Sequence, residues 1–377
     1  MSDYYVNSVT IHTYALYSGF YLLNITYMNK KYVLGAMALI VLIAVIAGYS
    51  EKERGSNVVI GALLPETGFG AYWGAPVRKG AELAVKDLKE KHGDHFSLII
   101  EDSRSDAKTA VSGANKLISV DKADALYTEF SGISSAVSPI AKENDKVLIY
   151  STFNQKILED NKKSIKTFIS YDVVCNELLK NIPKNSKVHI LSTIADAAPY
   201  CKSALLKELP EGNIKVTEGL TGIDFRTLLL QQKQNAYDYL IPITYEDGYY
   251  ALIKQKNELQ IAGSIFCYKA DCYTEKIKSE LPQSYLSGLM YFEVSIDSAF
   301  RERITKLFPD FTEGDISASA NAYQSIFMAG QTLYECKKDT ECAIKKMSNK
   351  TLENKGYSDA RVVNRNLESN ILIERVK

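Results

Sequence analysis

Short apolar runs alternate with longer stretches of helical spacing along most of this chain. The first apolar run, 58–64, reads VVIGALL and is typical of a buried strand. A glycine-rich loop follows it, and the stretch 76–92 then places apolar residues at helical spacing between charged ones. This succession indicates the opening of a βαβ unit in a parallel sheet. Because ligands of such sheets bind beyond the carboxyl ends of the strands, the loop carrying Tyr72 and Trp73 is a candidate binding edge.

The same alternation continues through the chain in two series, separated by the segment 168–171. A long helix at 316–335 and a final apolar strand at 371–376 follow the second series. We therefore predict an α/β fold with two doubly wound parallel-sheet lobes. The predicted strands are 58–64, 96–101, 123–127, 147–150, 188–192, 214–218, 239–244 and 264–268, and the predicted helices are 76–92, 107–119, 134–144, 173–181, 199–209, 225–234 and 248–259.

The N-terminal part of the chain carries a targeting signal. Residues 32–49 contain no charged side chain, two lysines precede them, and a polar run follows them. This pattern predicts a transmembrane anchor or a signal peptide, with the remainder of the chain outside the cytoplasm. Tyr49 stands where a lipoprotein would have its cysteine, and we favour an uncleaved anchor over cleavage. We expect residues 1–31 to be unstructured and hypothesise that translation starts at Met28.

Composition and motif content narrow the function classes. The 377 residues include 45 basic and 45 acidic side chains, so a net charge of zero provides no basic field for a nucleic acid. Four histidines occur, and none has a zinc-type spacing to the cysteines. The sequence contains no G-x-S-x-G elbow and no Walker loop. We therefore expect no enzyme, no nucleic-acid partner, and no metal or other cofactor.

All six cysteines follow the apolar segment, and an even number in an exported chain indicates disulfides. Two pairs are close enough in sequence to close small loops, which leaves one further pair, although six cysteines allow many other pairings. The candidate pairs are Cys267 with Cys272, Cys336 with Cys342, and Cys175 with Cys201.

Several motifs occur in an order that is typical of one protein family. They are the strand, aromatic-glycine loop and GAELA helix of 60–88, the helix, serine turn and strand of 101–154, the segment DFRTLLLQQKQNAYDYLIPITY at 224–245, and the helix ISASANAYQSIFMAGQTL at 316–333. In this order the chain resembles the periplasmic solute-binding proteins of the branched-chain amino-acid type, which are receptors of ABC importers. The resemblance implies the type I periplasmic-binding fold, with a three-segment hinge and lobes that close over a ligand. The implied lobes are 57–171 with 296–351, and 172–295 with 352–377.

The resemblance also implies ligand-binding residues in the first lobe. The family holds an amino-acid carboxylate with hydroxyls and backbone N–H groups, and the matching positions include Ser134, Ser135 and the loop of Ser151, Thr152 and Phe153. Serine is also a common helix N-cap, so Ser134 could instead only cap the following helix. Trp73, the only tryptophan, falls where the family places an aromatic side chain against the ligand, with Tyr72 as a weaker candidate. A lone tryptophan is otherwise often a packing residue.

In the second lobe the resemblance implies Tyr200 and Tyr245, although both could equally be packing tyrosines in a chain with 25 of them. The family usually has an acidic residue that pairs with the ligand ammonium. Here Lys269 takes that position, with Asp271 two residues later. If a Cys267–Cys272 bridge reshapes the loop, Asp271 can bind an ammonium; otherwise Lys269 would favour an anionic or amide ligand.

We therefore expect an extracytoplasmic, membrane-tethered receptor that captures a small polar solute by hinge closure and delivers it to an ABC permease. The solute would be an amino acid or a related amide or carboxylate. The alternative is a ligand-sensing extracellular domain that acts with a separate signalling partner. Neither function includes a chemical step.

Overall fold

The computed structural model describes residues 57–194, 197–352 and 356–377. The expected N-terminal segment 1–31 and the expected anchor at 32–49 lie outside these residues. Within the described ranges, no helix is both long enough and apolar enough to cross a membrane.

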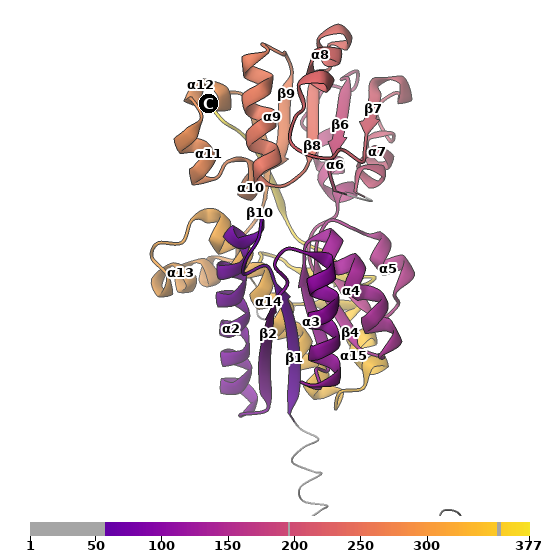
Figure 1. The fold of residues 1–377 in the computed structure, drawn as a ribbon, viewed down its shortest axis with the longest axis vertical. Helices are drawn as coiled ribbons and strands as arrows, with labels where there is room; N and C mark the ends of the chain where they lie inside the picture. Colours follow the sequence, from indigo (N-terminus) through magenta and orange to yellow (C-terminus); the bar gives the residue numbers. More distant parts are fainter. Residues whose placement is uncertain (1–56, 195–196, 353–355) are drawn as a thin grey trace, which may run out of the picture. The chain divides into compact units, whose positions relative to one another are not determined.

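The first lobe is built on an eight-stranded sheet with the order β11-β12-β13-β5-β4-β3-β1-β2. Figure 1 labels β1, β2 and β4 of this sheet. The strands β1 to β5 are parallel, and every residue of β3 and β4 is buried. Parallel strands covered by helices on both faces read as continuous apolar runs, which is why β1 to β4 were predicted from the sequence. The three-residue β5 was not predicted. The strands are β1 (Val58–Leu64), β2 (Phe96–Asp102), β3 (Ala125–Glu129), β4 (Val147–Ser151), β5 (Ser164–Lys166), β11 (Asn349–Thr351), β12 (Arg361–Val363) and β13 (Asn366–Glu368), and the helices are α2 (Ala71–His92), α3 (Ala107–Ser119), α4 (Ser131–Glu143), α5 (Lys156–Asp160), α13 (Ser298–Leu307), α14 (Glu313–Glu335) and α15 (Thr340–Met347).

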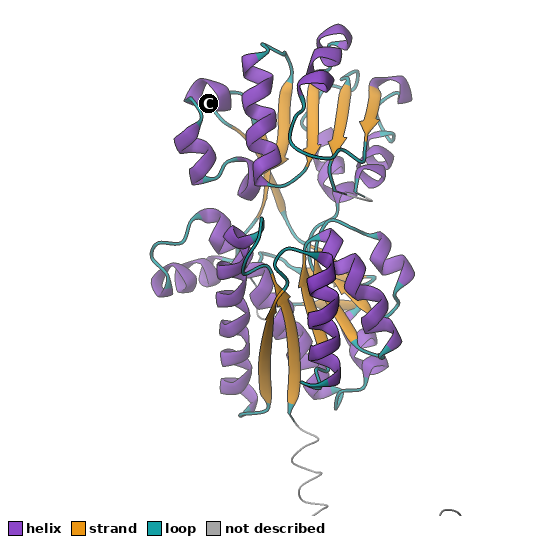
Figure 2. Cartoon of the chain, in the orientation of Figure 1, coloured by secondary structure: helices purple, strands orange, loops and turns teal. Residues whose placement is uncertain are grey.

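The second lobe is built on a six-stranded sheet with the order β14-β10-β9-β8-β6-β7. Figure 2 shows the strands of both lobes in orange and the helices in purple. Its strands are parallel except β14, which runs antiparallel to β10 at the edge of the sheet. The strands are β6 (Val188–Ser192), β7 (Ile214–Thr217), β8 (Tyr239–Ile243), β9 (Ser264–Tyr268), β10 (Met290–Val294) and β14 (Ile371–Arg375), and the helices are α6 (Tyr171–Leu179), α7 (Ala198–Leu205), η1 (Glu211–Asn213), α8 (Arg226–Asn235), α9 (Glu246–Glu258), α10 (Lys269–Cys272), α11 (Glu275–Glu280) and α12 (Gln283–Leu286).

The chain passes between the two sheets three times: after β5, after β10 and after β13. Both sheets therefore contain strands from separate parts of the sequence. Three chain segments therefore connect the two lobes. This is the arrangement of a two-lobed fold with a multi-segment hinge.

The tail of the chain differs from the expected division. We expected 352–377 to belong to the second lobe, but only β14 pairs with the second sheet, while β12 and β13 pair within the first. The guanidinium of Arg365, in the turn between β12 and β13, fixes this hairpin by donating to the carbonyls of Leu158 and Asn161 at 2.7 and 2.9 Å. The boundary at 352 is corrected to one between β13 and β14.

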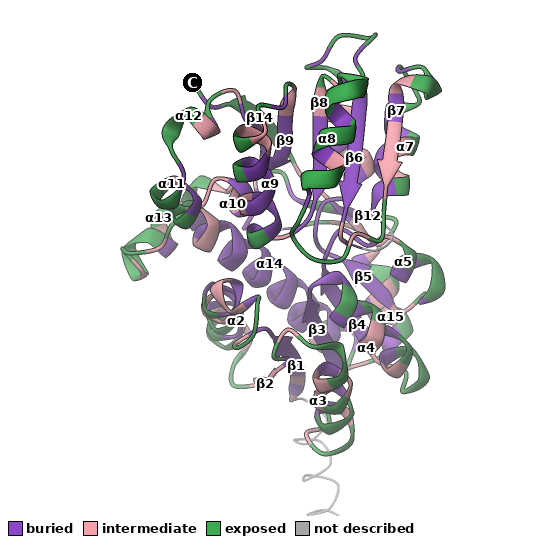
Figure 3. Ribbon diagram, turned by 45° about the horizontal axis from the view of Figure 1, so that its top comes forward, coloured by how far each residue is buried: buried purple, intermediate pink, exposed green. Residues whose placement is uncertain are grey.

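The long helix α14 is buried along most of its length (Figure 3). It begins at a capping box, in which the hydroxyl of Thr312 accepts from the N–H of Asp315 and the Asp315 carboxylate accepts in return. It packs closely on α2, where a Cβ at Gly80 would lie 2.1 Å from the carbonyl oxygen of Ser319. Only glycine allows the two helices to approach so closely at this position.

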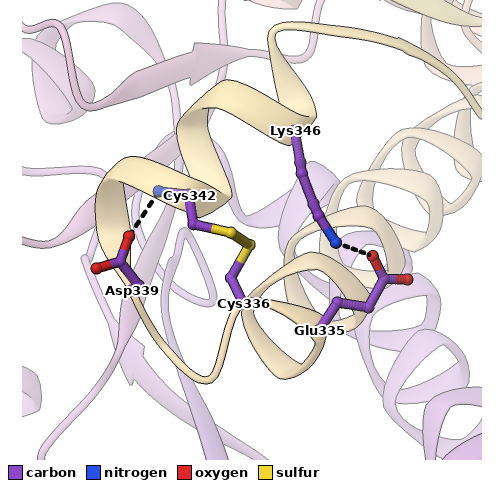
Figure 4. Close-up of a disulfide and its surroundings, with 5 residues drawn as sticks. All are labelled: Glu335, Cys336, Asp339, Cys342 and Lys346. Atoms are coloured by element: carbon purple, nitrogen blue, oxygen red, sulfur yellow. Dashed lines mark hydrogen bonds and ion pairs between the residues drawn. A yellow bond between two sulfur atoms is a disulfide. The ribbon is translucent and has the colours of Figure 1, made fainter.

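Three disulfides are present, and the described residues contain no free cysteine. One of them links the end of α14 to α15, beside an ion pair of 3.1 Å between Lys346 and Glu335 (Figure 4). Another closes a small loop after β9, and the third joins α6 to α7. The bonded pairs are the expected ones, Cys336 with Cys342, Cys267 with Cys272, and Cys175 with Cys201.

Candidate functional site

The carboxyl ends of strands from both sheets border a small cavity of about 40 Å³. Glu129 ends β3 and Ser151 ends β4, and the two residues are paired in register. Tyr245 follows β8, and Asp271 follows β9 in the helix α10. This is the position at which open parallel sheets bind ligands. The cavity, which we call the inner cavity, is lined by Tyr72, Trp73, Glu129, Phe130, Ser131, Ser151, Thr152, Phe153, Phe168, Tyr245, Tyr268 and Asp271.

Glu129 provides a carboxylate on the first-lobe side of the inner cavity. Its side chain is buried, accepts a hydrogen bond from the Tyr127 hydroxyl, and accepts another from the indole N–H of Trp73 at 3.3 Å. It also interacts with the Ser151 hydroxyl. Burial raises the pKa of Glu129 to about 7, and these three hydrogen bonds oppose the shift. No motif or spacing in the sequence marks Glu129 beyond its place at the end of a strand.

Asp271 provides a carboxylate on the second-lobe side. Within the described part of the chain its hydrogen-bond donor is the Tyr72 hydroxyl, at 3.2 Å from Oδ1. Burial raises the pKa of Asp271 to about 7; the Tyr72 hydrogen bond opposes this shift and the nearby Glu246 adds to it. The disulfide from Cys267 to Cys272 closes the turn that carries Asp271 and so holds its backbone against the end of β9.

Aromatic side chains form most of the remaining wall. Phe153 packs edge-to-face on Phe168 with ring centroids 4.9 Å apart, and Phe168 packs on Tyr268 at 5.5 Å. At another edge, Phe130 and Tyr245 lie 5.0 Å apart in an edge-to-face pair. The Phe168–Tyr268 and Phe130–Tyr245 contacts join the two lobes, so these contacts form only when the lobes lie together.

The hydroxyls of the first lobe gather where α4 begins. The Ser131 hydroxyl donates to Thr152 Oγ1 at 3.0 Å, and Thr152 Oγ1 also accepts from the N–H of Asn154 at 2.8 Å. Phe130, which precedes the helix, has a φ of 63°, in a left-handed region that non-glycine residues rarely adopt. This backbone strain turns Glu129 and Ser131 toward the same cavity, and strain of this kind is concentrated at functional sites.

A larger cavity of about 280 Å³ shares the side chains of Tyr72, Trp73 and Tyr268 with the inner cavity. We call it the outer cavity. Its remaining wall carries charges of both signs, from Glu246, Lys269, Glu275, Lys276, Lys278, Glu293, Glu313 and Asp315.

The sequence of residues 57–366 matches the family model described as periplasmic binding protein. The chain belongs to the periplasmic binding protein family. This match covers the strands β1 to β12 and all the residues that line the inner cavity.

Curated relatives and solved structures of this family are also similar to the chain. Leu/Ile/Val-binding protein homolog 2 of Brucella abortus is 28% identical over 195 residues, covering 48% of this chain and 52% of that protein. Leu/Ile/Val-binding protein BraC3 of Rhizobium johnstonii is 26% identical, covering 56% and 60% of the two chains. The chain thus spans about half the length of the curated relatives it matches.

Two solved structures show the same fold. An ABC-transporter solute-binding protein of Rhodopseudomonas palustris in complex with 3,4-dihydroxybenzoic acid has a TM-score of 0.68 and 18% identity, covering 85% of this chain and 93% of that one. The branched-chain amino acid transporter substrate-binding protein LivJ of Streptococcus pneumoniae, in complex with isoleucine, has a TM-score of 0.68 and 16% identity, covering 85% and 96%.

The structure brings together most of the residues that the family resemblance implied. The inner cavity contains Tyr72, Trp73, Ser151, Thr152, Phe153, Tyr245 and Asp271. Tyr72 and Trp73 lie in the first turn of α2, which begins at Ala71 and not at 76 as predicted, because the buried Trp73 packs as part of the helix. Glu129, Phe130, Ser131, Phe168 and Tyr268 line the cavity without having been predicted.

Ser134 and Ser135, which the resemblance implied as ligand-binding residues, line neither cavity. Ser134 Oγ lies 2.8 Å from Thr128 Oγ1, and Ser135 Oγ accepts from the Asn154 side chain at 3.1 Å. The reason is the start of α4, which lies at Ser131 and not at 134. Ser131, one turn earlier, takes the position expected of Ser134.

Tyr200 and Lys269 also lie outside the inner cavity. The Tyr200 hydroxyl donates to Glu159 at 3.0 Å, on the exposed side of α5. Lys269 lines the outer cavity, where its Nζ donates to Glu293 at 2.8 Å and lies 5.1 Å from the centre of the Tyr291 ring. Of the two residues considered for the acidic position, Asp271 is the one that faces the inner cavity.

Metal binding has no support in the described part of the chain, where no three His, Cys, Asp or Glu side chains are grouped to hold an ion.

Proposed function

We propose that this chain is a solute-binding receptor that captures a small polar molecule in the inner cavity and delivers it to an ABC permease. The observation that carries this proposal is the cavity itself, which both lobes line with the carboxyl ends of their strands. Relatives of the family are named for leucine, isoleucine and valine binding, and related structures hold isoleucine or a dihydroxybenzoate. The anchor expected at 32–49 would tether the receptor outside the cytoplasm.

The mechanism is binding followed by closure about the three connecting segments. Tyr72 and Trp73 of the first lobe line the inner cavity together with Asp271 and Tyr268 of the second, so a solute in the cavity would contact both lobes. Such a solute binds the closed arrangement more strongly than an open one and therefore shifts the population toward closure. Asp271 would accept hydrogen bonds from a ligand ammonium, and the hydroxyls of Ser131 and Thr152 would bind its polar groups.

A thermal-shift screen of the full chain tests this proposal. The panel contains amino acids, small amides, benzoates and amines. A ligand that binds only the folded state at about a hundredfold excess over Kd stabilises it by about 2.7 kcal/mol, so at least one class should raise the Tm. The Asp271→Asn variant should lose most of the shift, while Asp310→Asn, which makes the same charge change at an exposed site, should keep it. No shift with any class would overturn the proposal.

A further inference from the structure

The inner cavity has a buried carboxylate on each side and no matching cation. Glu129 is 2% exposed and Asp271 is 6% exposed. The twelve described residues of the lining include no Lys, Arg or His. A buried carboxylate is costly unless a counter-charge or several hydrogen bonds compensate it. Two such groups, one from each lobe, therefore form a site whose negative charge is not compensated by a cation of the lining.

Hydrogen bonding compensates the two carboxylates unequally. Glu129 has three donors, whereas the carboxylate of Asp271 has the single Tyr72 hydroxyl among the described residues. The nearest lysine along the chain, Lys269, is paired with Glu293 in the outer cavity. Asp271 therefore has room for a cationic partner that the chain itself does not supply.

The hydroxyls that could bind a ligand carboxylate are largely engaged already. Ser151 interacts with Glu129, and Ser131 donates to Thr152. A ligand carboxylate beside these groups would also lie close to Glu129, and like charges in a buried site repel strongly. The first-lobe wall is thus poorly suited to an anion.

The aromatic wall favours a cation for a separate reason. Seven of the twelve lining residues are aromatic: Tyr72, Trp73, Phe130, Phe153, Phe168, Tyr245 and Tyr268. The faces of such rings attract ammonium groups, most strongly when water is excluded. A volume of about 40 Å³ fits a small charged group, and the outer cavity behind the three shared aromatic side chains has space for the rest of a larger solute.

We propose that the solute of this receptor is an organic cation, an amine without a carboxylate at its charged end, whose ammonium group lies between Glu129 and Asp271. This inference rests on the proposed receptor function and names its ligand class. It predicts that removing the carboxylate from an amino-acid probe improves binding, and that removing the amine abolishes it.

Cation binding also has a defined pH dependence. Burial raises the pKa of both Glu129 and Asp271 to about 7, so both are largely protonated below that pH in the empty site. A cation favours the ionised forms, so its affinity increases as the pH rises through about 7, whereas the affinity of an anion decreases. The other titratable groups around the two carboxyls are Glu246 and a set of buried tyrosines. Burial raises the pKa of each tyrosine of this set, which consists of Tyr72, Tyr127, Tyr171, Tyr245, Tyr249, Tyr268 and Tyr357.

Calorimetric titration of the full chain with three probes of one shape tests the inference. The probes are L-leucine, isoamylamine (leucine without its carboxylate) and 4-methylpentanoate (leucine without its amine). At pH 8 we expect isoamylamine to bind at least about tenfold more tightly than leucine, with no binding of 4-methylpentanoate. Glu129→Gln should weaken isoamylamine binding by about tenfold, while Glu302→Gln, the same change at an exposed position, should leave it unchanged.

The outcomes separate this inference from the receptor function. Tighter binding of leucine or 4-methylpentanoate than of isoamylamine would overturn the cation inference and leave the receptor function standing. The set of cationic probes also includes butane-1,4-diamine, agmatine and tetramethylammonium. If none of the cationic probes bound, the cation inference would be overturned as well. If amino acids, amides and benzoates also failed to bind, the receptor function would fall with it.

Discussion

The hydroxyl of Tyr72 donates a hydrogen bond of 3.2 Å to the carboxylate of Asp271, across 199 residues of sequence. Tyr72 belongs to α2 of the first lobe and Asp271 to α10 of the second. This contact therefore links the lobes at the wall of the inner cavity, and it supplies the Asp271 carboxylate with a donor from the opposite lobe. We therefore expect ligand binding, lobe closure and the charge state of Asp271 to be coupled through this hydrogen bond.

Replacing Tyr72 with phenylalanine removes this donor and keeps the ring. We expect solute affinity to fall by about 1–2 kcal/mol, or roughly tenfold, because a hydrogen bond to a charged group is lost at the closed interface. Titration calorimetry measures the change. Tyr200→Phe is the matched control, since Tyr200 also bonds across the lobes, to Glu159, but lines neither cavity. Equal losses in the two variants would mean that the Tyr72 effect comes from lobe docking alone.

The Cys267–Cys272 disulfide closes the loop that carries Asp271, whereas the Cys336–Cys342 disulfide at α15 lies outside the site. Both bridges close loops of similar length, with sequence separations of 5 and 6, so their removal should cost similar stability, about 2 kcal/mol each. Changing Cys267 and Cys272 together to serine should also weaken solute binding, because the turn that carries Asp271 is released. The double change at Cys336 and Cys342 should lower the Tm without changing affinity. Retention of full affinity in the first variant would show that β9 and α10 hold Asp271 unaided.

Lys269 should contribute to stability and not to ligand choice. Its ammonium pairs with Glu293 at 2.8 Å, and both side chains are about four-fifths buried. Lys269→Met removes the pair, and we expect a loss of about 0.5–1 kcal/mol in the free energy of unfolding, measured by urea denaturation. The order of affinities among leucine, isoamylamine and 4-methylpentanoate should not change. A reversed order would place Lys269 in contact with the solute.

Glu129 and Asp271 should contribute less to the stability of the empty receptor as the pH rises from about 4 to 7. The folded-state pKa values of Glu129 and Asp271, about 7, exceed those of an unfolded chain, so the folded state binds more protons across this interval. Their stabilising contribution is complete below about pH 4 and is lost as the pH rises to about 7. Buried His189, with its pKa lowered to about 4, acts in the opposite direction, so the comparison must be made between variants.

The double variant Glu129→Gln with Asp271→Asn isolates this effect. Its unfolding free energy should decrease less than that of the wild type between pH 4 and 7, by a few kcal/mol. Chemical denaturation at several pH values measures the difference. Parallel pH profiles for the two proteins would show that the carboxyls titrate normally in the folded state.

Much of the fold follows from the sequence, and the exceptions have identifiable causes. The core strands are long apolar runs between amphipathic helices, so β1, β3 and β8 could be located from local patterning. The hairpin of β12 and β13 could not, because its strands are three residues long and Arg365 stabilises it through carbonyls about 200 residues away. Local patterns contain no information about such distant contacts.

The site was predicted less completely for the same reason. Trp73 and Asp271 could be selected from motifs, but Glu129 becomes part of the site only through Trp73, which is 56 residues away, and through Tyr127. The choice between Lys269 and Asp271 depended on how the Cys267–Cys272 loop folds. The predicted start of the helix at 134 was wrong, because α4 begins at Ser131 with no side-chain cap to mark it.

Trp73 provides the most direct test, because it is the only tryptophan of the chain and its indole N–H donates to Glu129 at the inner cavity. Tryptophan fluorescence of the full chain therefore reports on this site alone. Addition of isoamylamine at pH 8 should give a saturable change in emission that disappears in the Glu129→Gln/Asp271→Asn variant. An emission spectrum that neither isoamylamine nor leucine alters, or a change that persists in the double variant, would contradict solute binding in the inner cavity.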